Sequence, residues 1–518
     1  MSAGPRSRHA GAFFATVNPV VFLASAVIVA VFVGFGVIFP VAAGEVFGRL
    51  HRFITEYFGW AYLLAVTGFL AFLLWLVVSR YGRIRLGQPE ERPRFGLLAW
   101  FAMLFSTGMG IGLVFWSVAE PILHFQDPPS GDGGTAQAAR QAMVYTYFHW
   151  GLHAWAVYVV LGLSVAYFSY RHGLPLTIRS IFYPMLGDRI YGPIGHVIDV
   201  LAVFGTLFGL ATSLGFGAMQ LNTGLHELVG LPVSHWVQVG LIATITGIAV
   251  ISVLSGLDRG LKWLSIFNLS LALLVVIFVL LLGPTLFIIR FLLESTGSYL
   301  QQIVELSLST DAIGGSEWQK EWTIFYWGWW IAWSPFVGIF IAQISRGRTI
   351  REFIVGVLMM PTLFVLVWMT VFGGTALHFE LFDSDSGIAS AVAQDTTLAL
   401  YVTLERLPLT TLTSIAATLL IATYFVTSSD SGTHVVDKLI SRGSKRSPRR
   451  QRVIWGITEG AVAATLLIVG GTEALNSLQT ASVTAGLPVA VILTFACINL
   501  YRSLQREYRV EGVEPPWG

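Results

Sequence analysis

The sequence has few charged residues and a single cysteine. Lys, Arg, Asp and Glu together make up 12% of the 518 residues, whereas a soluble domain has about 25%. Because Cys497 is the only cysteine, no disulfide can form within the chain. The net charge of +2 gives no strong attraction to nucleic acid or to another acidic partner. These shortages exclude a soluble enzyme, a disordered chain and a nucleic-acid-binding module.

Long apolar stretches take the place of the missing charges. Hydrophobic residues account for 55% of the chain, and the mean hydropathy is +0.70. About 20 apolar residues are enough to cross a bilayer as a helix. We therefore predict an all-α polytopic membrane protein with twelve transmembrane helices. The predicted spans are residues 18–40, 58–79, 96–119, 143–169, 195–225, 234–255, 264–290, 323–343, 353–377, 410–431, 453–470 and 477–500.

The basic residues predict the orientation of these spans. With the N-terminus in the cytoplasm, 25 of the 31 Lys and Arg residues fall on the cytoplasmic side. Both termini are then inside, and two amphipathic segments, 297–309 and 388–405, lie outside. The first span has no small-residue cleavage site, so we expect it to be retained. The densest basic run, 438–452, is an orientation signal or a contact for anionic lipid.

Two spans carry unusual backbone chemistry. The third contains Gly108, Gly110 and Gly112, which weaken a helix and favour either an unwound turn at a cavity or close helix packing. The eighth contains four tryptophans within seven residues, followed by Pro335, which removes a backbone bond and kinks the helix, so we expect this span to be broken as well. The two spans are five helices apart. Interruptions at corresponding positions predict inverted repeats, helices 3–7 and 8–12, and a binding site at the membrane midplane.

Aromatic residues of the fourth and eighth spans are candidates for a binding cage. Helical spacing places Trp327, Trp330 and Trp333 on one face and directs Trp329 elsewhere. Rings lining a cavity suit a quaternary ammonium group through cation–π attraction, and ordinary aromatic packing is the alternative. His149 and His153 fit a metal pair or a proton relay, but we favour packing for both. The candidate cage residues are Trp150, Trp155, Tyr158, Trp330 and Trp333.

The tenth span offers oxygen atoms for a small cation. Thr427, Ser428, Ser429 and Ser431 place four hydroxyls beside the carboxylate of Asp430. A charged residue inside a membrane is a functional candidate, and hydroxyl bonding to the helix backbone is the alternative reading. Asp430 lies near the cytoplasmic end, where a gate or a helix tether fits as well as a ligand.

Three motifs together resemble the betaine/choline/carnitine transporter family over about residues 15–500. They are FYWGWWIAWSPFVGIFIAQISRGRTIRE (Phe325–Glu352), GMGIGLVFWSVAEP (Gly108–Pro121) and FHWGLHAWAVY (Phe148–Tyr158). The resemblance implies a LeuT-like fold, a homotrimer and alternating access in a bacterial inner membrane. It divides the chain into a cytoplasmic tail 1–17, one transporter domain 18–500 and a short tail 501–518. Within the domain, two peripheral helices (18–79) precede repeat 1 (96–290) and repeat 2 (323–500).

The resemblance also implies roles for particular residues. The solute's methyl groups would lie among the cage residues, with Trp333 next to the gate, and its carboxylate would face the turn Gly108, Met109, Gly110 and Gly112. One Na⁺ would bind the carbonyl oxygens of Ser106, Met109 and Tyr424 and the hydroxyls of Thr427 and Ser428. A second would use Thr206 near Phe336, but Leu210 replaces an expected threonine and puts that site in doubt. Trp327 and Asp430 are gate candidates.

These features predict a sodium-coupled importer of a betaine-type compatible solute. Gly112 stands where choline and carnitine carriers of the family often have Asp, so glycine favours a zwitterion. Sodium-independent exchange and proton-coupled uptake are the alternatives, and ectoine, proline or choline could replace betaine. A polytopic enzyme is a remote alternative, because the sequence contains no GxSxG, HExxH or CxxC motif. A sensor and a channel also fit poorly.

Overall fold

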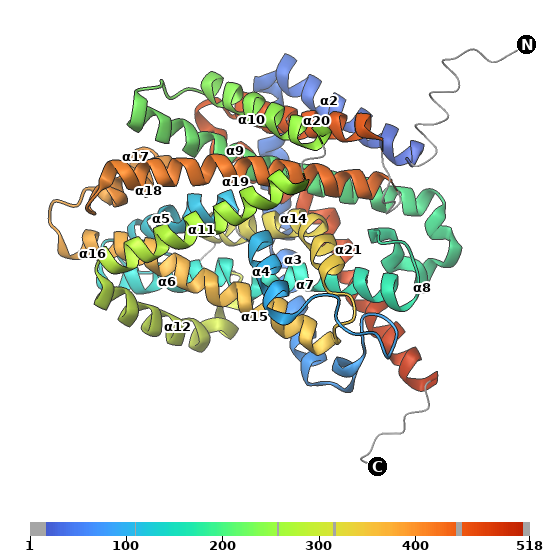
Figure 1. Cartoon of the computed structure of the whole chain (residues 1–518). Coiled ribbons are helices and arrows are strands. Elements are labelled where there is room, and N and C mark those ends of the chain that lie inside the picture. The colour runs from blue at the N-terminus through green and yellow to red at the C-terminus, as the bar shows by residue number, and fades with distance from the viewer. Residues whose placement is uncertain (1–16, 109, 256–257, 314–316, 442–447, 511–518) are drawn as a thin grey trace, which may run out of the picture.

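The computed structural model describes residues 17–108, 110–255, 258–313, 317–441 and 448–510. In these ranges the regular elements are helices, and ten helical segments are long and apolar enough to cross a membrane. The third predicted span is absent from that count because its helix is interrupted. The predicted eleventh and twelfth spans run together as one segment from Arg449 to Tyr508. The protein is therefore a polytopic helical membrane protein (Figure 1).

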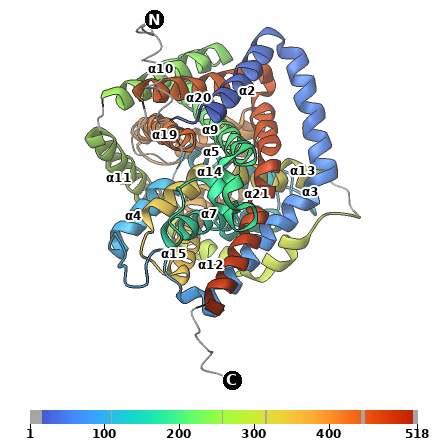
Figure 2. The same ribbon diagram turned by 90° about the vertical axis from the view of Figure 1, so that its right-hand side faces the viewer.

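Burial separates central from peripheral helices. The segment Glu317–Ile344 contains α14 (Thr323–Ile344) and the tryptophan motif, and 94% of its apolar window is buried. The value is 22% in α2 (Pro19–Ile38) and 39% in α3 (Pro40–Val78). Figure 2 shows α2 and α3 at the edge of the bundle and α14 near its middle. The motifs that bear the chemistry therefore lie on central helices, away from lipid.

The third predicted span is interrupted where the glycines predict. One helix, α4, covers Leu97–Gly108, and the next, α5, begins at Ile111 and ends at Gln126. Gly110 has an extended backbone (φ −145°, ψ −179°) and forms the N-terminal cap of α5. The first amides of α5 have no carbonyl four residues earlier in the helix, and the amide of Leu113 donates instead to the carbonyl of Gly110 at 3.2 Å.

The fourth predicted span is also interrupted, which the sequence analysis did not predict. Helix α6 (Ala136–Trp150) ends at Gly151, and α7 (Leu152–Ala166) starts directly after it. A Cβ atom at Gly151 would lie 2.5 Å from the carbonyl oxygen of Tyr147. Only glycine fits this close approach, so the break depends on that residue.

The predicted break in the eighth span is wrong. Helix α14 continues through Pro335 without interruption. Proline cannot donate to the carbonyl of the residue four positions earlier, which here is Ile331. The hydroxyl of Ser334 donates to that carbonyl oxygen at 2.8 Å. The missing backbone bond is thereby replaced, and the helix has no unsatisfied carbonyl at this point.

Several helices begin or end at residues other than those predicted from the sequence. Helix α3 includes residues predicted as an outer loop. The seventh span ends at Leu282, earlier than predicted, and the segment 297–309 lies almost entirely in a separate helix, α12 (Thr285–Leu308). The helix that ends the fold, α21, reaches Val510 and absorbs much of the predicted C-tail. The remaining helices are α8 (Tyr183–Leu186), α9 (Pro193–Val229), α10 (His235–Ser255), α11 (Asp258–Leu282), α12 (Thr285–Leu308), α13 (Glu317–Glu321), α15 (Ile350–Met369), α16 (Thr375–Phe382), α17 (Ile388–Gln394), α18 (Ala399–Leu404), α19 (Thr410–Ile440), α20 (Arg449–Gly470) and α21 (Ala474–Val510).

Candidate solute-binding site

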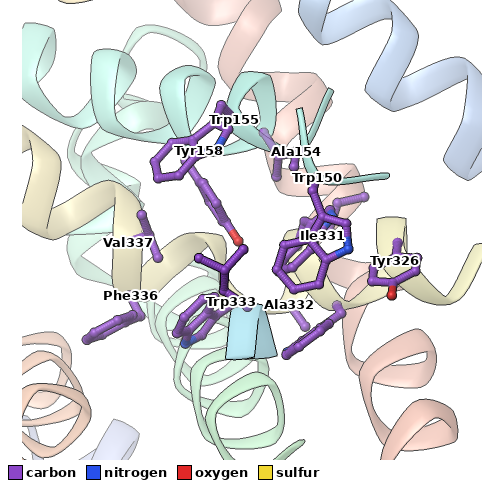
Figure 3. Packing of buried hydrophobic residues seen from close by; sticks show 14 of the residues in the cluster. Trp150, Ala154, Trp155, Tyr158, Tyr326, Ile331, Ala332, Trp333, Phe336 and Val337 are labelled. Atoms are coloured by element: carbon purple, nitrogen blue, oxygen red, sulfur yellow. The ribbon is translucent and has the colours of Figure 1, made fainter. Parts of the chain in front are cut away.

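Residues of α5, α6, α7, α14 and α15 enclose a small aromatic cavity at the centre of the bundle. Its volume is about 30 Å³, which is room for roughly one or two water-sized groups. Figure 3 shows the rings of Trp150, Trp155, Tyr158 and Trp333 around one space. The lining residues are Gly110, Gly112, Leu113, Trp150, Ala154, Trp155, Tyr158, Trp329, Trp330, Trp333, Val337 and Val365.

The structure thus brings all five predicted cage residues to one cavity. The centroids of Trp150 and Trp330 lie 4.8 Å apart at an interplanar angle of 69°. Tyr158 lies 5.5 Å from Trp155 and 6.4 Å from Trp333, in edge-to-face arrangements. Different rings therefore present faces and edges to the same space. Whether they bind a solute remains a prediction.

Two tryptophans differ from the predicted arrangement. Trp329, which helical spacing directed elsewhere, lines the cavity and stacks on Trp330 at 4.7 Å. Trp327 is buried against Phe148 and His153 and is not among the lining residues. Four tryptophans on adjacent turns cannot all be assigned to faces by spacing alone, because large rings sweep far around the helix axis.

Gly112 has a packing reason to be glycine. A Cβ atom there would lie 2.3 Å from Cη2 of Trp329. At Gly110 the nearest atom, Cη2 of Trp333, would be 3.5 Å away, which is an ordinary contact. The absence of a side chain at Gly112 therefore admits Trp329 to the cavity, in addition to any effect on solute charge.

The break at Gly151 also positions a cage ring. Helix α6 ends just before Gly151, so its last carbonyl groups lack helical partners. The carbonyl oxygen of His149 accepts a hydrogen bond from Nε1 of Trp330 at 2.8 Å. The helix end therefore orients the indole of Trp330 across the interface between α6 and α14.

A buried carboxylate holds a second cage ring. Oε2 of Glu120 accepts hydrogen bonds from Nε1 of Trp150 at 2.6 Å and from the hydroxyl of Tyr326 at 2.5 Å. Oε1 lies 2.7 Å from Nδ1 of His149 and 3.2 Å from Nε2 of His124. All of these side chains are buried. Sequence reasoning missed Glu120, although an acidic residue within an apolar span was a usable signal.

Three of these buried side chains, Glu120, His124 and His149, form a hydrogen-bond network. Glu120, His124 and His149 are residue types that bind metals, and their nearest ligand atoms lie within 4.8 Å of one another. Zn²⁺ sits about 2.0–2.2 Å from each nitrogen and oxygen ligand, which separates tetrahedral ligands by more than 3 Å. The 2.7 Å between Oε1 of Glu120 and Nδ1 of His149 is instead a hydrogen-bond distance.

The predicted cation site is only partly described. Met109 lies outside the described residues, as does the side chain of Ser106. On α19, the hydroxyl of Thr427 donates to the backbone carbonyls of Thr423 and Tyr424, both at 3.1 Å. It also accepts a bond from the buried amide of Asn268 on α11 at 3.3 Å. Tyr424 is buried and Ser428 partly buried on the same helix.

The residues of the predicted second cation site lie deep in the bundle. The hydroxyl of Thr206 is buried and donates to the carbonyl of Ala202 at 2.8 Å. Phe336 stacks on Trp333 at 5.6 Å, next to the cavity. Leu210 packs so closely on α19 that a Cβ atom at Gly432 would lie 2.1 Å from its Cδ2. Asp430, the gate candidate, is also buried.

Comparison with known proteins assigns the family. Residues 20–509 match the model of the betaine/carnitine/choline family transporters. The chain belongs to this family. It is 47% identical to the glycine betaine transporter OpuD of Bacillus subtilis over 92% of each chain. Identity to the glycine betaine transporter of Acinetobacter baylyi is 43%, over 95% of this chain and 74% of the relative. The high-affinity choline transport protein of Escherichia coli is 42% identical over 96% of this chain and 73% of its own length.

In this transporter of the betaine/carnitine/choline family, the three sequence motifs contain most of the rings that line the cavity. The motifs do not show which hydrogen bonds between helices hold these side chains in place. Glu120 lies at the end of the glycine motif, and its partners are on α6 and α14. Asn268 comes from α11, far in sequence from Thr427. Residues of this kind act across helices, so a local pattern can mark Glu120 as unusual but cannot name its partners.

Proposed function

We propose that the chain is a sodium-coupled symporter that imports a betaine-type compatible solute, glycine betaine first. The observation that carries the proposal is the central cavity, in which Trp150, Tyr158, Trp330 and other rings surround one space. A quaternary ammonium group cannot donate a conventional hydrogen bond, so aromatic faces are its natural partners. Relatives named as glycine betaine transporters support betaine as the first choice of solute.

Two unpaired donors in the cavity lining suit the carboxylate of a zwitterion. The hydroxyl of Tyr158 and Nε1 of Trp333 are both buried without a hydrogen-bond partner. A buried donor without a partner costs about 1–3 kcal/mol, which a carboxylate would recover. The cavity of about 30 Å³ must widen to admit a trimethylammonium group, and rotation of the rings would provide that room.

Sodium would act by joining the interrupted third span to α19. The proposed ligands are Ser106, Met109 and Tyr424 through carbonyl oxygens, and Thr427 and Ser428 through hydroxyls. Carbonyl and hydroxyl oxygens are suitable for a small hard cation. Binding at this position would order the turn that faces the cavity, which gives the differential affinity that coupling requires. A second sodium at Thr206 and Phe336 is not part of the proposal, because Leu210 fills the space toward α19.

The finer features of the fold and assembly are also proposals. We propose twelve spans, counting the interrupted α4–α5 pair as one and separating α20 from α21, arranged as LeuT-like inverted repeats. We further propose a homotrimer in the bacterial inner membrane with both termini in the cytoplasm. The basic run 438–452 would contact anionic lipid, although residues 442–447 lie outside the described residues.

The deciding experiment is uptake of radiolabelled glycine betaine into proteoliposomes. An inward sodium gradient, an inward proton gradient and no gradient are compared at a clamped membrane potential. We expect uptake only with sodium, with weak competition by choline. The double variant Thr427→Ala and Ser428→Ala should raise the sodium concentration required for half-maximal uptake, and an unchanged requirement would remove the proposed cation site.

Other outcomes would select the alternatives. Uptake without any gradient, accelerated by solute loaded inside the vesicles, would identify an exchanger. Uptake driven by protons alone would identify proton-coupled transport. Failure to take up betaine under every gradient, followed by uptake of choline, ectoine or proline, would replace the solute and keep the family.

A further inference from the structure

A second cavity lies beside the cage and is connected to it by hydrogen bonds. Its volume is about 190 Å³, and Thr323 is one of its lining residues. The hydroxyl of Thr323 lies 2.9 Å from Nε2 of His149, and Nδ1 of the same ring lies 2.7 Å from Oε1 of Glu120. The other lining residues are Pro129, Ser130, Tyr145, Phe148, Leu306, Ser309, Asp311, Trp318 and Gln319.

The far end of this chain of bonds is the cage itself. Oε2 of Glu120 accepts from Trp150 at 2.6 Å and from Tyr326 at 2.5 Å. Because an indole nitrogen can only donate, Oε2 is an acceptor in every protonation state. Oε1, which lies 2.7 Å from Nδ1 of His149, can take an exchangeable proton without disturbing this bond. The imidazole has one nitrogen toward the cavity and one toward the carboxylate, which is the geometry of a relay.

We propose that Glu120 binds a proton delivered from this second cavity through Thr323 and His149, and that this proton opposes binding of the solute's quaternary ammonium group in the cage. The inference rests on the proposed function, because it requires the cage to hold that group. It adds a proton site to a solute site, and it applies whichever ion drives transport.

The transfer conserves protons and leaves every participating atom hydrogen-bonded. A hydronium ion in the cavity gives a proton to the hydroxyl of Thr323 and is left as water, while Thr323 passes its own proton to Nε2 of His149. Nδ1 of His149 releases its proton to Oε1 of Glu120. The carboxylate becomes a carboxylic acid, and the imidazole stays neutral with its proton on the other nitrogen. Nδ1 then accepts from Glu120, and Nε2 donates to Thr323.

Protonation changes the cage in two ways. The bonds from Trp150 and Tyr326 to Glu120 lose the strengthening that an ionised acceptor provides. The negative charge at the Nε1 edge of the Trp150 indole also disappears, and with it an attraction for a cation in the cage. Both effects weaken binding of the solute. The titratable groups around the site are His124 on α5, His149 and Tyr145 on α6, His153 on α7, Tyr326 on α14 and Asp311 at the second cavity.

The test is the pH dependence of glycine betaine binding to the purified full-length protein, measured by tryptophan fluorescence at fixed saturating sodium. The charge of the solute does not change between about pH 5 and about pH 9, because its carboxyl group is far more acidic than an ordinary side-chain carboxyl. We expect the dissociation constant to rise roughly tenfold from the alkaline to the acidic limit. Because linkage is reciprocal, solute binding near the midpoint should release protons to a weakly buffered medium.

Variants assign the effect to Glu120. Glu120→Gln mimics the protonated group, so its dissociation constant should be independent of pH and equal to the acidic limit of the wild type. Glu459→Gln is the matched control, since Glu459 is buried on α20 and bonded to Thr433. It should keep the wild-type profile.

A second variant keeps the proposal testable if Glu120→Gln does not fold. Tyr326→Phe removes one bond that favours the ionised carboxylate, so the midpoint of the profile should move up by about one to two pH units. A purely structural role would shift affinity equally at every pH. Binding by the wild type with no pH dependence, or an unchanged profile in Glu120→Gln, would overturn this inference and leave the cage intact. Absence of betaine binding by the wild type would instead count against the proposed function.

Discussion

At the scale of single residues, the cavity depends on how each ring is anchored. Trp330 is held by the carbonyl of His149 and Trp150 by Glu120, whereas Trp333 and Tyr158 keep polar atoms unpaired. Rings with fixed partners give the cavity its shape, and unpaired donors give it capacity to bind. The two kinds of residue should respond differently to substitution.

Trp330→Ala should weaken glycine betaine binding without unfolding the protein. Loss of one cation–π partner costs about 0.5–2 kcal/mol, which is about a 2- to 30-fold rise in the dissociation constant. Isothermal titration with betaine measures the change, and thermal unfolding verifies the fold. Trp263→Ala is the matched control, because Trp263 is exposed on α11. Wild-type affinity in Trp330→Ala would contradict the cage.

Gly112→Ala should damage the cavity by displacing Trp329. The new Cβ atom would lie 2.3 Å from the indole, and overpacking of this kind costs about 1–3 kcal/mol. Solute affinity should fall, and the melting temperature should fall with it. The control is Gly68→Ala on α3, where nothing lies within 4 Å of the added atom. Equal effects of the two substitutions would show that contact with Trp329 is unimportant.

At the scale of elements, residue propensity alone does not decide where helices break. Pro335 is the stronger helix breaker by propensity, yet α14 continues because Ser334 satisfies the carbonyl of Ile331. Gly151 is a weaker signal, yet α6 ends there, and a Cβ atom at this position would lie 2.5 Å from the carbonyl oxygen of Tyr147. A sequence pattern gives the propensity but not the replacement partner, which explains why one break was predicted wrongly and another was missed.

Ser334→Ala should lower the thermal stability of the protein. The carbonyl of Ile331 would be left buried and unpaired, at a cost of about 1–3 kcal/mol. Adding Pro335→Ala restores a backbone N–H at the same carbonyl, so the double variant should recover most of the loss. Thermal unfolding in one detergent measures both. A double variant as unstable as Ser334→Ala would show that the hydroxyl acts elsewhere.

At the scale of the whole molecule, the orientation in the membrane can be tested with single cysteines. Replacing Cys497 by serine gives a chain without cysteine. Ser384→Cys places an exposed thiol in a segment predicted outside, and Gln88→Cys places one in a segment predicted inside. A membrane-impermeant maleimide should label the first in intact cells and the second only after permeabilisation. The reverse pattern would invert the topology.

The sequence alone determined the class of the protein, most of its spans and the rings of the candidate site. Apolar length fixes spans because lipid cannot hydrogen-bond a backbone, and aromatic motifs are local enough to be read directly. Tertiary structure decided the break at Gly151, the continuity of α14, the inclusion of Trp329 and the exclusion of Trp327. It also decided the role of Glu120, whose partners come from two other helices. These features depend on which groups meet across helices, and a local pattern contains no information about such meetings.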